Sequence, residues 1–127
     1  RYFDERNLTM EKTFLVEKYG KMRKLGFYLS RYCENQNLFV GLFVDGEDGI
    51  EPWSDVTVNL SVPLPDFVGF IDVNDGNEDL PEWLERIGAG RRTGRAMRSG
   101  FVVYPEFSFN PAFFAQHYPN EYAKVKR

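Results

Sequence analysis

The spacing of apolar residues predicts β-strands through the first part of the chain. Within residues 24–33, apolar side chains occupy every second position from Leu25 to Leu29, the period of a half-buried strand. Residues 38–44 (LFVGLFV) are apolar throughout, which is typical of a central strand covered on both faces. Residues 13–18, 56–60 and 68–73 also have strand character, whereas the Gly- and acid-rich residues 45–52 are expected to form a loop.

Two short helices are predicted in the C-terminal half. Asp79 is a candidate N-cap with Glu82 three residues later, which is the capping-box spacing, and Gly88 is a candidate terminator. Asn110-Pro111 opens the second helix, which is expected to stop before Pro119. The apolar face of the first helix would consist of Leu80, Trp83, Leu84 and Ile87.

The segment between these helices completes the expected fold. Residues 88–100 contain four glycines and no periodicity, so they are predicted to form a loop. Residues 101–109 are expected to form a strand that Pro105 interrupts, at a sheet edge or a bulge. The fold class is therefore α+β, with a mainly antiparallel sheet of about five or six strands and two short helices in the C-terminal half.

Length and composition indicate one folded domain. The 127 residues contain 17% aromatic side chains, which favours an aromatic core. Residues 1–9 precede Met10 and are predicted to be an N-terminal extension, with a single domain over residues 10–127. No apolar run approaches the roughly 20 residues of a membrane span, and the first residues lack the apolar region of a signal peptide. We expect a cytoplasmic protein without membrane contact.

Charge is sorted along the chain. Residues 45–85 hold twelve carboxylates and no Lys or Arg. A surface of one sign attracts and orients a partner of the opposite sign, although acidic loops are most often simply solvated. Binding of Ca²⁺ is a third interpretation, but the stretch lacks the Gly and Glu spacing of an EF-hand. The carboxylates expected to contact a partner are Asp45, Glu47, Asp48, Glu51, Asp72, Asp75, Glu78 and Asp79.

The next segment, residues 86–98, has the opposite composition, with five Arg and no acid. Guanidinium groups match phosphate oxygens, and glycines let a backbone approach a phosphate closely. The segment lacks the context of a dinucleotide fingerprint and the Lys of a P-loop. It is either a solvated loop that partly neutralises its own domain or an anion or nucleic-acid contact made by Arg91, Arg92, Arg95 and Arg98.

Catalytic signatures are weak. His117 is the only histidine and is placed on a short aromatic helix, where a structural role is more common than a catalytic one. Cys33 is predicted to be a small buried hydrophobe that cannot form an intramolecular disulfide. One Cys and one His make zinc improbable. We therefore expect no catalytic residues, no metal and no cofactor.

Several short motifs resemble a family of short uncharacterised proteins from bacterial mobile elements and phages, over roughly residues 12–110. The motifs are Thr57-Val-Asn-Leu60, Phe70-Ile-Asp-Val-Asn74, Thr93-Gly94, Ser99-Gly-Phe101, Tyr104-Pro105 and Phe109-Asn110. The family is a domain of unknown function, so the resemblance implies no catalytic residues. It implies a setting in which small accessory proteins bind host or element proteins, including defence nucleases.

These observations favour a non-enzymatic accessory protein of a phage or mobile element. It would bind a host or element protein that has a basic surface, and it would act as an inhibitor of a host nucleic-acid-binding defence complex. One alternative is a nucleic-acid-binding protein that uses the arginine-rich loop of residues 86–98. Another is an enzyme that acts on a phosphorylated small molecule at that loop. The sequence does not indicate the oligomeric state.

Overall fold

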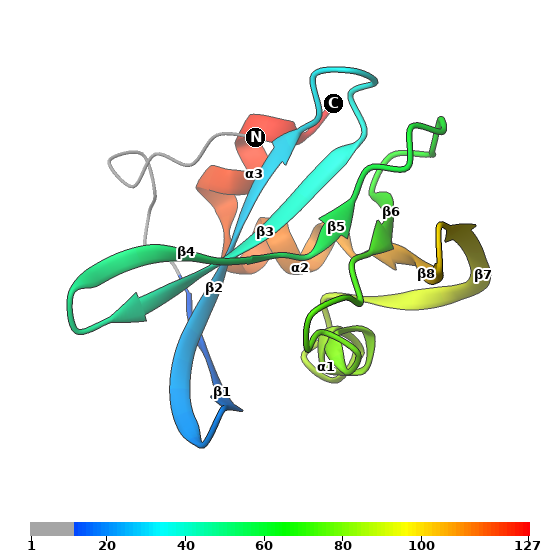
Figure 1. Cartoon of the computed structure of the whole chain (residues 1–127). Coiled ribbons are helices and arrows are strands. Elements are labelled where there is room, and N and C mark those ends of the chain that lie inside the picture. Colours follow the sequence, from blue (N-terminus) through cyan, green and yellow to red (C-terminus); the bar gives the residue numbers. More distant parts are fainter. Residues whose placement is uncertain (1–11) are drawn as a thin grey trace.

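The computed structural model describes residues 12–127, so the extension predicted at residues 1–9 lies outside the described residues. An antiparallel sheet of four strands, in the order β1-β2-β3-β4, forms the first half of the fold (Figure 1). Its central strand β3 is buried along most of its length, as the apolar run at residues 38–44 predicts. The strands are β1 (Phe14–Lys18), β2 (Lys21–Arg31), β3 (Leu38–Gly46) and β4 (Gly49–Asp55).

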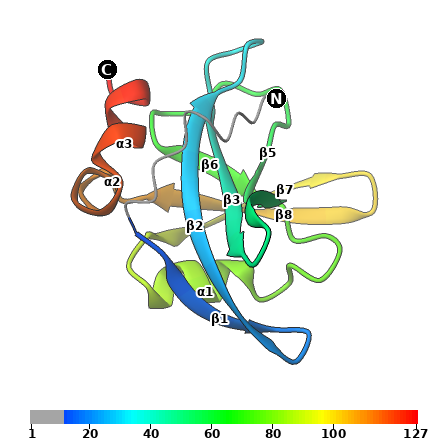
Figure 2. The same cartoon turned by 90° about the vertical axis from the view of Figure 1, so that its left-hand side faces the viewer.

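A second antiparallel sheet of four strands, in the order β5-β6-β8-β7, runs across the direction of β2 (Figure 2). Helix α1 precedes β7, and α2 and α3 follow β8 at the C-terminal end. None of the helices formed by residues 12–127 is long and apolar enough to cross a membrane. The elements are β5 (Thr57–Val58), β6 (Val68–Ile71), α1 (Leu80–Arg86), β7 (Gly90–Ser99), β8 (Val102–Phe109), α2 (Pro111–His117) and α3 (Pro119–Val125).

The α+β class with antiparallel pairing is confirmed, but the expected numbers of sheets, strands and helices are wrong. The described residues form two sheets of four strands each and three short helices. Residues 45–52 belong mostly to a β3–β4 hairpin, because Gly46 pairs with Gly49 and leaves a two-residue turn. The third helix begins at Pro119, which ends α2 and occupies the first turn of α3, where a missing N–H costs nothing.

Residues 88–100 are predicted to be a loop, but most of them form strand β7. Two of their glycines have structural roles in this strand and its turn. Gly90 packs so closely against Ser108 and Phe107 of β8 that a Cβ would collide with them. Gly100 adopts a φ of +64° at the first position of a two-residue turn with Phe101. The absence of periodicity reflects a register shift between Arg92 and Ala96.

The two sheets meet at Val56 and Thr57. The Val56 amide donates to the Val40 carbonyl of β3, and the Asp72 amide donates to the Val56 carbonyl. The buried Thr57 hydroxyl accepts a hydrogen bond from the Val40 amide at 3.1 Å. The residue that leaves the first sheet is therefore hydrogen-bonded to the second as well.

One aromatic core lies between the sheets and the helices. Phe27 of β2 is fully buried at its centre. Its ring stacks on Trp83 of α1 and meets Phe113, Phe114 and Tyr118 edge-on, with ring centroids 5.5–5.9 Å apart. The sequence-based expectation of an aromatic core is confirmed.

Helix α3 covers an edge of β2 that β1 does not reach. The amide of Leu29 has no strand partner on that side and donates to Oε1 of Glu121 at 2.9 Å. Glu121 is 1% exposed, and its second oxygen accepts a hydrogen bond from Lys124 at 2.7 Å. This carboxylate is therefore structural.

Candidate functional site: a groove between strand β1 and helix α1

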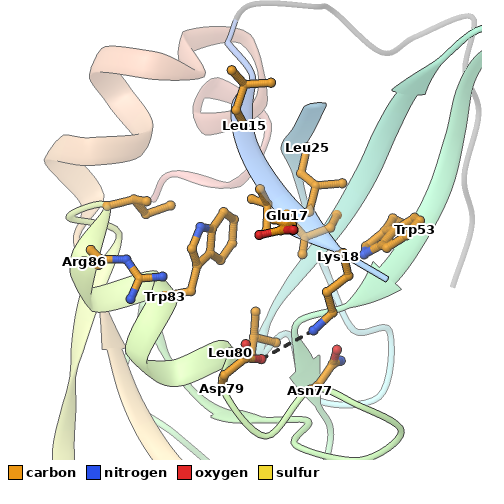
Figure 3. A pocket seen from close by; sticks show the side chains of 13 residues that line it. Leu15, Glu17, Lys18, Leu25, Trp53, Asn77, Asp79, Leu80, Trp83 and Arg86 are labelled. Atoms are coloured by element: carbon orange, nitrogen blue, oxygen red, sulfur yellow. Dashed lines mark hydrogen bonds and ion pairs between the residues drawn. The ribbon is translucent and has the colours of Figure 1, made fainter. Parts of the chain in front are cut away.

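A groove with a volume of about 350 Å³ lies between β1 and α1 (Figure 3). Four consecutive residues of β1, Leu15–Lys18, form one wall, so the strand presents its edge to the groove. Leu80 and Trp83 of α1, with Ile87 directly after the helix, form the opposite wall. The volume lies within the roughly 300–1,000 Å³ typical of ligand sites.

Two tryptophans give the groove its apolar character. Trp83 points from α1 toward β1 and stacks on Phe27 at 5.9 Å, so the wall of the groove is continuous with the core (Figure 3). Trp53 of β4 lines the other side beside Lys18. The Arg23 guanidinium lies over the Trp53 ring at 5.3 Å, which holds that ring in place.

Lys18 closes one end of the groove. Its Nζ donates to the Gly76 carbonyl at 2.9 Å and lies 3.4 Å from Oδ1 of Asp79 (Figure 3). Asp79 precedes α1 but makes no side-chain capping bond, so the predicted capping box is absent. The end of α1 does follow the prediction, because Gly88 has a φ of +88° and the Ala89 amide returns to the Leu84 carbonyl.

The hairpin formed by β1 and β2 exposes apolar side chains beside this groove. Leu15 is 65% exposed, Met22 is 62% exposed and Tyr19 at the turn is 74% exposed. Leu15 and Met22 lie on the same face, because Glu17 pairs with Met22 and alternate residues share a face. Exposed apolar side chains gathered beside an apolar groove are typical of a binding surface.

The eight acidic residues of the sequence-based hypothesis fall into two groups. Asp45, Glu47, Asp48 and Glu51 lie on the β3–β4 hairpin, which faces the basic side of β2 across an open hollow. Asp72, Asp75, Glu78 and Asp79 lie in the segment between β6 and α1, next to the groove. The β1–β2 hairpin borders both hollows, so its cations lie beside both acidic groups.

The four arginines of the alternative hypothesis lie along strand β7 and not on a loop. Arg92 pairs with Glu85 through Nε and Nη2, at 3.2 and 2.5 Å. Arg95 pairs with Glu106 at 2.5 Å. In the described part of the chain, Arg91 and Arg98 have no ion pair, and the strand register places them on opposite faces of the hairpin.

Both carboxylates that pair with these arginines are held in the ionised form. The side-chain and backbone hydrogen bonds from Arg92 lower the pKa of Glu85 below its ordinary value of 4.5. Burial alone would raise the pKa of Glu106, but hydrogen bonds from Arg95 and Thr93 and the charge of Arg95 outweigh it and lower that pKa. Two of the four arginines therefore act within the fold.

The structure also places the remaining candidates, His117 and Cys33. His117 lies on α2 with its ring 4.9 Å from Phe113, in an aromatic contact. Cys33 is exposed, so the expectation of a buried thiol is wrong: it follows the end of β2, where the chain turns outward. Within residues 12–127, no group of three or more His, Cys, Asp or Glu residues is placed to hold a metal ion.

The architecture is an α+β domain with two antiparallel sheets, an aromatic core and a groove along one edge strand. A family described as a domain of unknown function, DUF4313, matches residues 26–125, and the chain belongs to this family. The match includes α1 and the helices after Asn110, and begins after β1. It confirms the expected family of unknown function. No curated protein and no solved structure matches the chain.

Proposed function

We propose that this protein is a non-enzymatic, cytoplasmic binding protein that captures a partner protein through a basic surface on that partner. The main support for this proposal is a difference in ion pairing among its carboxylates. Asp66, Glu85 and Glu106 each have a cation within 4.0 Å in the described part of the chain. Of the eight carboxylates in the two acidic groups, only Asp79 has a cation within that distance in the described part of the chain.

The exposed carboxylates lie on both sides of the β1–β2 hairpin, whose cations are close by but, within the described residues, form an ion pair only with Asp79. Glu47, Asp48 and Glu51 are solvent-exposed on the β3–β4 hairpin, and Asp75 and Glu78 are exposed before α1. Such charges speed the encounter with a basic partner more than they add affinity at equilibrium. The Debye length is about 10 Å at 0.1 M salt, so capture should weaken as salt is added.

We further propose that the partner belongs to a host complex that binds nucleic acid and that the protein acts for a phage or mobile element. Spaced carboxylates imitate the repeated negative charge of a nucleic-acid backbone, and a cleft that binds that backbone is basic. The proposal is supported by the two acidic groups, in which Asp79 alone forms an ion pair within the described residues, and by the motif resemblance. It is an inhibitor hypothesis in which the acidic groups occupy the cleft.

The test is affinity capture of the tagged chain from nuclease-treated bacterial lysate, read by mass spectrometry. We expect a specific protein that is retained by the wild-type chain and lost with Glu47→Lys/Asp48→Lys. A matched control, Glu34→Lys/Glu82→Lys, changes the net charge equally at exposed positions outside the two groups. Equal capture by both variants at low salt would contradict the role of the acidic groups.

A second candidate function is nucleic-acid binding by the tip of the β7–β8 hairpin. Phe101 is fully exposed at the turn, and Arg98 lies close by on β7. An exposed aromatic ring can stack on a base while a guanidinium contacts a phosphate. Fluorescence anisotropy with a labelled single-stranded oligonucleotide at low salt tests it, with loss of binding expected for Phe101→Ser/Arg98→Gln. Binding unaffected by that variant would contradict this candidate.

A further inference from the structure

We propose that the partner is held by strand addition: an extended segment of it pairs with the edge of β1 that no other strand of the described residues covers, and lies in the groove against α1. This inference rests on the proposed binding function and adds the mode of recognition. Its basis is that the groove has a strand edge on one side and an apolar helix face on the other. Backbone pairing to such an edge supplies affinity, and alternate side chains supply specificity.

The register of the β1–β2 hairpin shows which backbone groups are available. Tyr19 and Gly20 form a two-residue turn with φ values of +54° and +76°, as in a type I′ turn. Lys18 and Lys21 therefore exchange hydrogen bonds, and hydrogen-bonded pairs alternate from there. The amides and carbonyls of Leu15 and Glu17 consequently point away from β2, toward the groove.

The other edge strands of the described fold are protected against such pairing. Strand β4 carries Pro52 and a register shift opposite β3, and β5 has two residues. Strand β7 carries its own register shift between Arg92 and Ala96. Prolines, bulges and short strands are the usual means of blocking an edge. Strand β1 has five residues in regular register and none of these features.

The walls of the groove determine what the added strand must look like. A residue of the added strand opposite Val16 would point inward, as the partly buried Val16 does, toward Trp83 and Leu80. Residues opposite Leu15 and Glu17 would point outward, beside those two exposed side chains. Apolar residues are therefore expected at alternate positions of the segment.

Charge identifies the outward-facing residue. Glu17 is exposed and has no ion pair in the part of the chain that the structure describes. Asp79, at the end of the groove that Lys18 closes, forms an ion pair with Lys18 but is largely exposed to solvent. The occupant is thus an extended protein segment with alternating apolar residues and with Lys or Arg beside Glu17. This basic character agrees with the partner that the acidic groups require.

The experiment selects a displayed library of random dodecapeptides on the immobilised full-length chain. We expect enrichment of peptides in which Leu, Val or an aromatic residue alternates with Lys or Arg. When the chain is bound to an enriched synthetic peptide, NMR should show the Leu15 and Glu17 amides exchanging hydrogen at least tenfold more slowly than in the free chain. The Val16 amide already bonds to β2 and should change less.

Two proline variants separate edge pairing from loss of fold. Leu15→Pro removes an amide that faces the groove, whereas the control Val103→Pro removes an amide of β8 that points away from β7, outside the groove. We expect Leu15→Pro to weaken peptide binding at least tenfold and Val103→Pro to leave it within twofold. A peptide N-methylated at the residues that face β1 should also lose binding.

Several outcomes would overturn the inference. One is that the library yields no enriched peptide pattern. Another is that Leu15→Pro binds the peptide as tightly as the wild type. A third is that the Leu15 and Glu17 amides exchange hydrogen as fast with the peptide as without it. Concentration-dependent dimerisation that gives the same protection without peptide would assign the edge to a second copy of the chain. If lysate capture depends on the acidic groups while Leu15→Pro captures normally, strand addition fails and the proposed function stands. If nothing is captured from lysate, the proposed function fails.

Discussion

Gly41 shows how one missing side chain shapes the outer face of the first sheet. It pairs with Tyr28 of β2, and a Cβ at this position would lie 2.5 Å from Cζ of the tyrosine ring. The opposite arrangement occurs at Gly26, where the ring of Phe43 covers the glycine. Aromatic rings placed over cross-strand glycines thus fill the surface that the glycines leave open.

We expect Gly41→Ala to lower the free energy of unfolding by about 1–3 kcal/mol, because the added methyl group must displace the buried Tyr28 ring. Gly46→Ala is a matched control on the same strand, since its nearest neighbour would be the Gly49 carbonyl at 3.8 Å. Urea unfolding of both variants measures the difference. Equal stabilities would show that the Tyr28 ring relaxes without cost.

Glu106 carries a charge that affects stability at low pH. It is 7% exposed and accepts hydrogen bonds from Arg95 and Thr93, at 2.5 and 2.8 Å. Its pKa is lower in the folded chain than its ordinary value of 4.5. The charged form therefore stabilises the fold above about pH 4.5, and this contribution disappears as the pH falls through the folded pKa.

We expect Glu106→Gln to lower the free energy of unfolding by about 1–3 kcal/mol at pH 7, the usual range for losing a hydrogen bond to a charged group. The difference from the wild type should shrink as the pH falls below about 4.5, toward the lowered pKa at which Glu106 becomes protonated in the folded wild type. Denaturant unfolding at several pH values measures this trend. A difference that does not shrink at any acidic pH where the chain still folds would indicate lost packing and not lost charge.

At the level of elements, α3 and β2 depend on one buried carboxylate. Glu121→Ala leaves the Leu29 amide without an acceptor, so we expect a loss of about 1–3 kcal/mol and faster hydrogen exchange at Leu29. Glu121→Gln keeps an acceptor oxygen and should cost less. Amide exchange by NMR resolves the two variants. Unchanged exchange at Leu29 in Glu121→Ala would show that α3 does not protect this edge.

The sequence predicted elements well where burial determines the pattern. The apolar run at residues 38–44 is the central strand β3, and Leu80, Trp83 and Leu84 form the buried face of α1. Both follow from periodicity, because each element buries one defined set of positions. The class of fold followed from the same signals.

Strand β7 could not be recognised in this way. Its glycines and arginines suggest a loop, but they reflect close packing on β8, a register shift and a tight turn. A strand whose side chains are mostly exposed leaves no apolar alternation to detect. Pairing with β8 is a long-range property, so it overrides the local composition.

The groove could not be recognised from the sequence either, for a related reason. Leu15 and Trp83 are distant in the chain, and each is consistent with ordinary core packing when considered alone. Within the described residues, this region is distinguished by an edge of β1 that no other strand covers and by the exposure of Leu15, Tyr19 and Met22. The acidic residues were visible because charge can be counted, but their division into two groups depends on the β1–β2 hairpin.

In the whole molecule, the two sheets share one hydrophobic core. Phe27 and Val40 of the first sheet belong to the same buried cluster as Ile71 and Phe107 of the second. Phe114 of α2 is part of it as well. Neither sheet can bury its apolar face without the other, so we expect the two sheets to unfold together.

The two tryptophans test this expectation because they report from different elements. Trp53 lies on β4 of the first sheet, and Trp83 lies on α1, beside the second. In Trp53→Phe and Trp83→Phe, the remaining tryptophan reports one region while far-UV circular dichroism reports the whole chain. We expect the fluorescence and dichroism midpoints in urea to coincide within each variant, although the midpoints of the two variants will differ. Separated midpoints, or a plateau between two transitions, would show that one sheet persists alone and that the cluster around Phe27 does not couple the sheets.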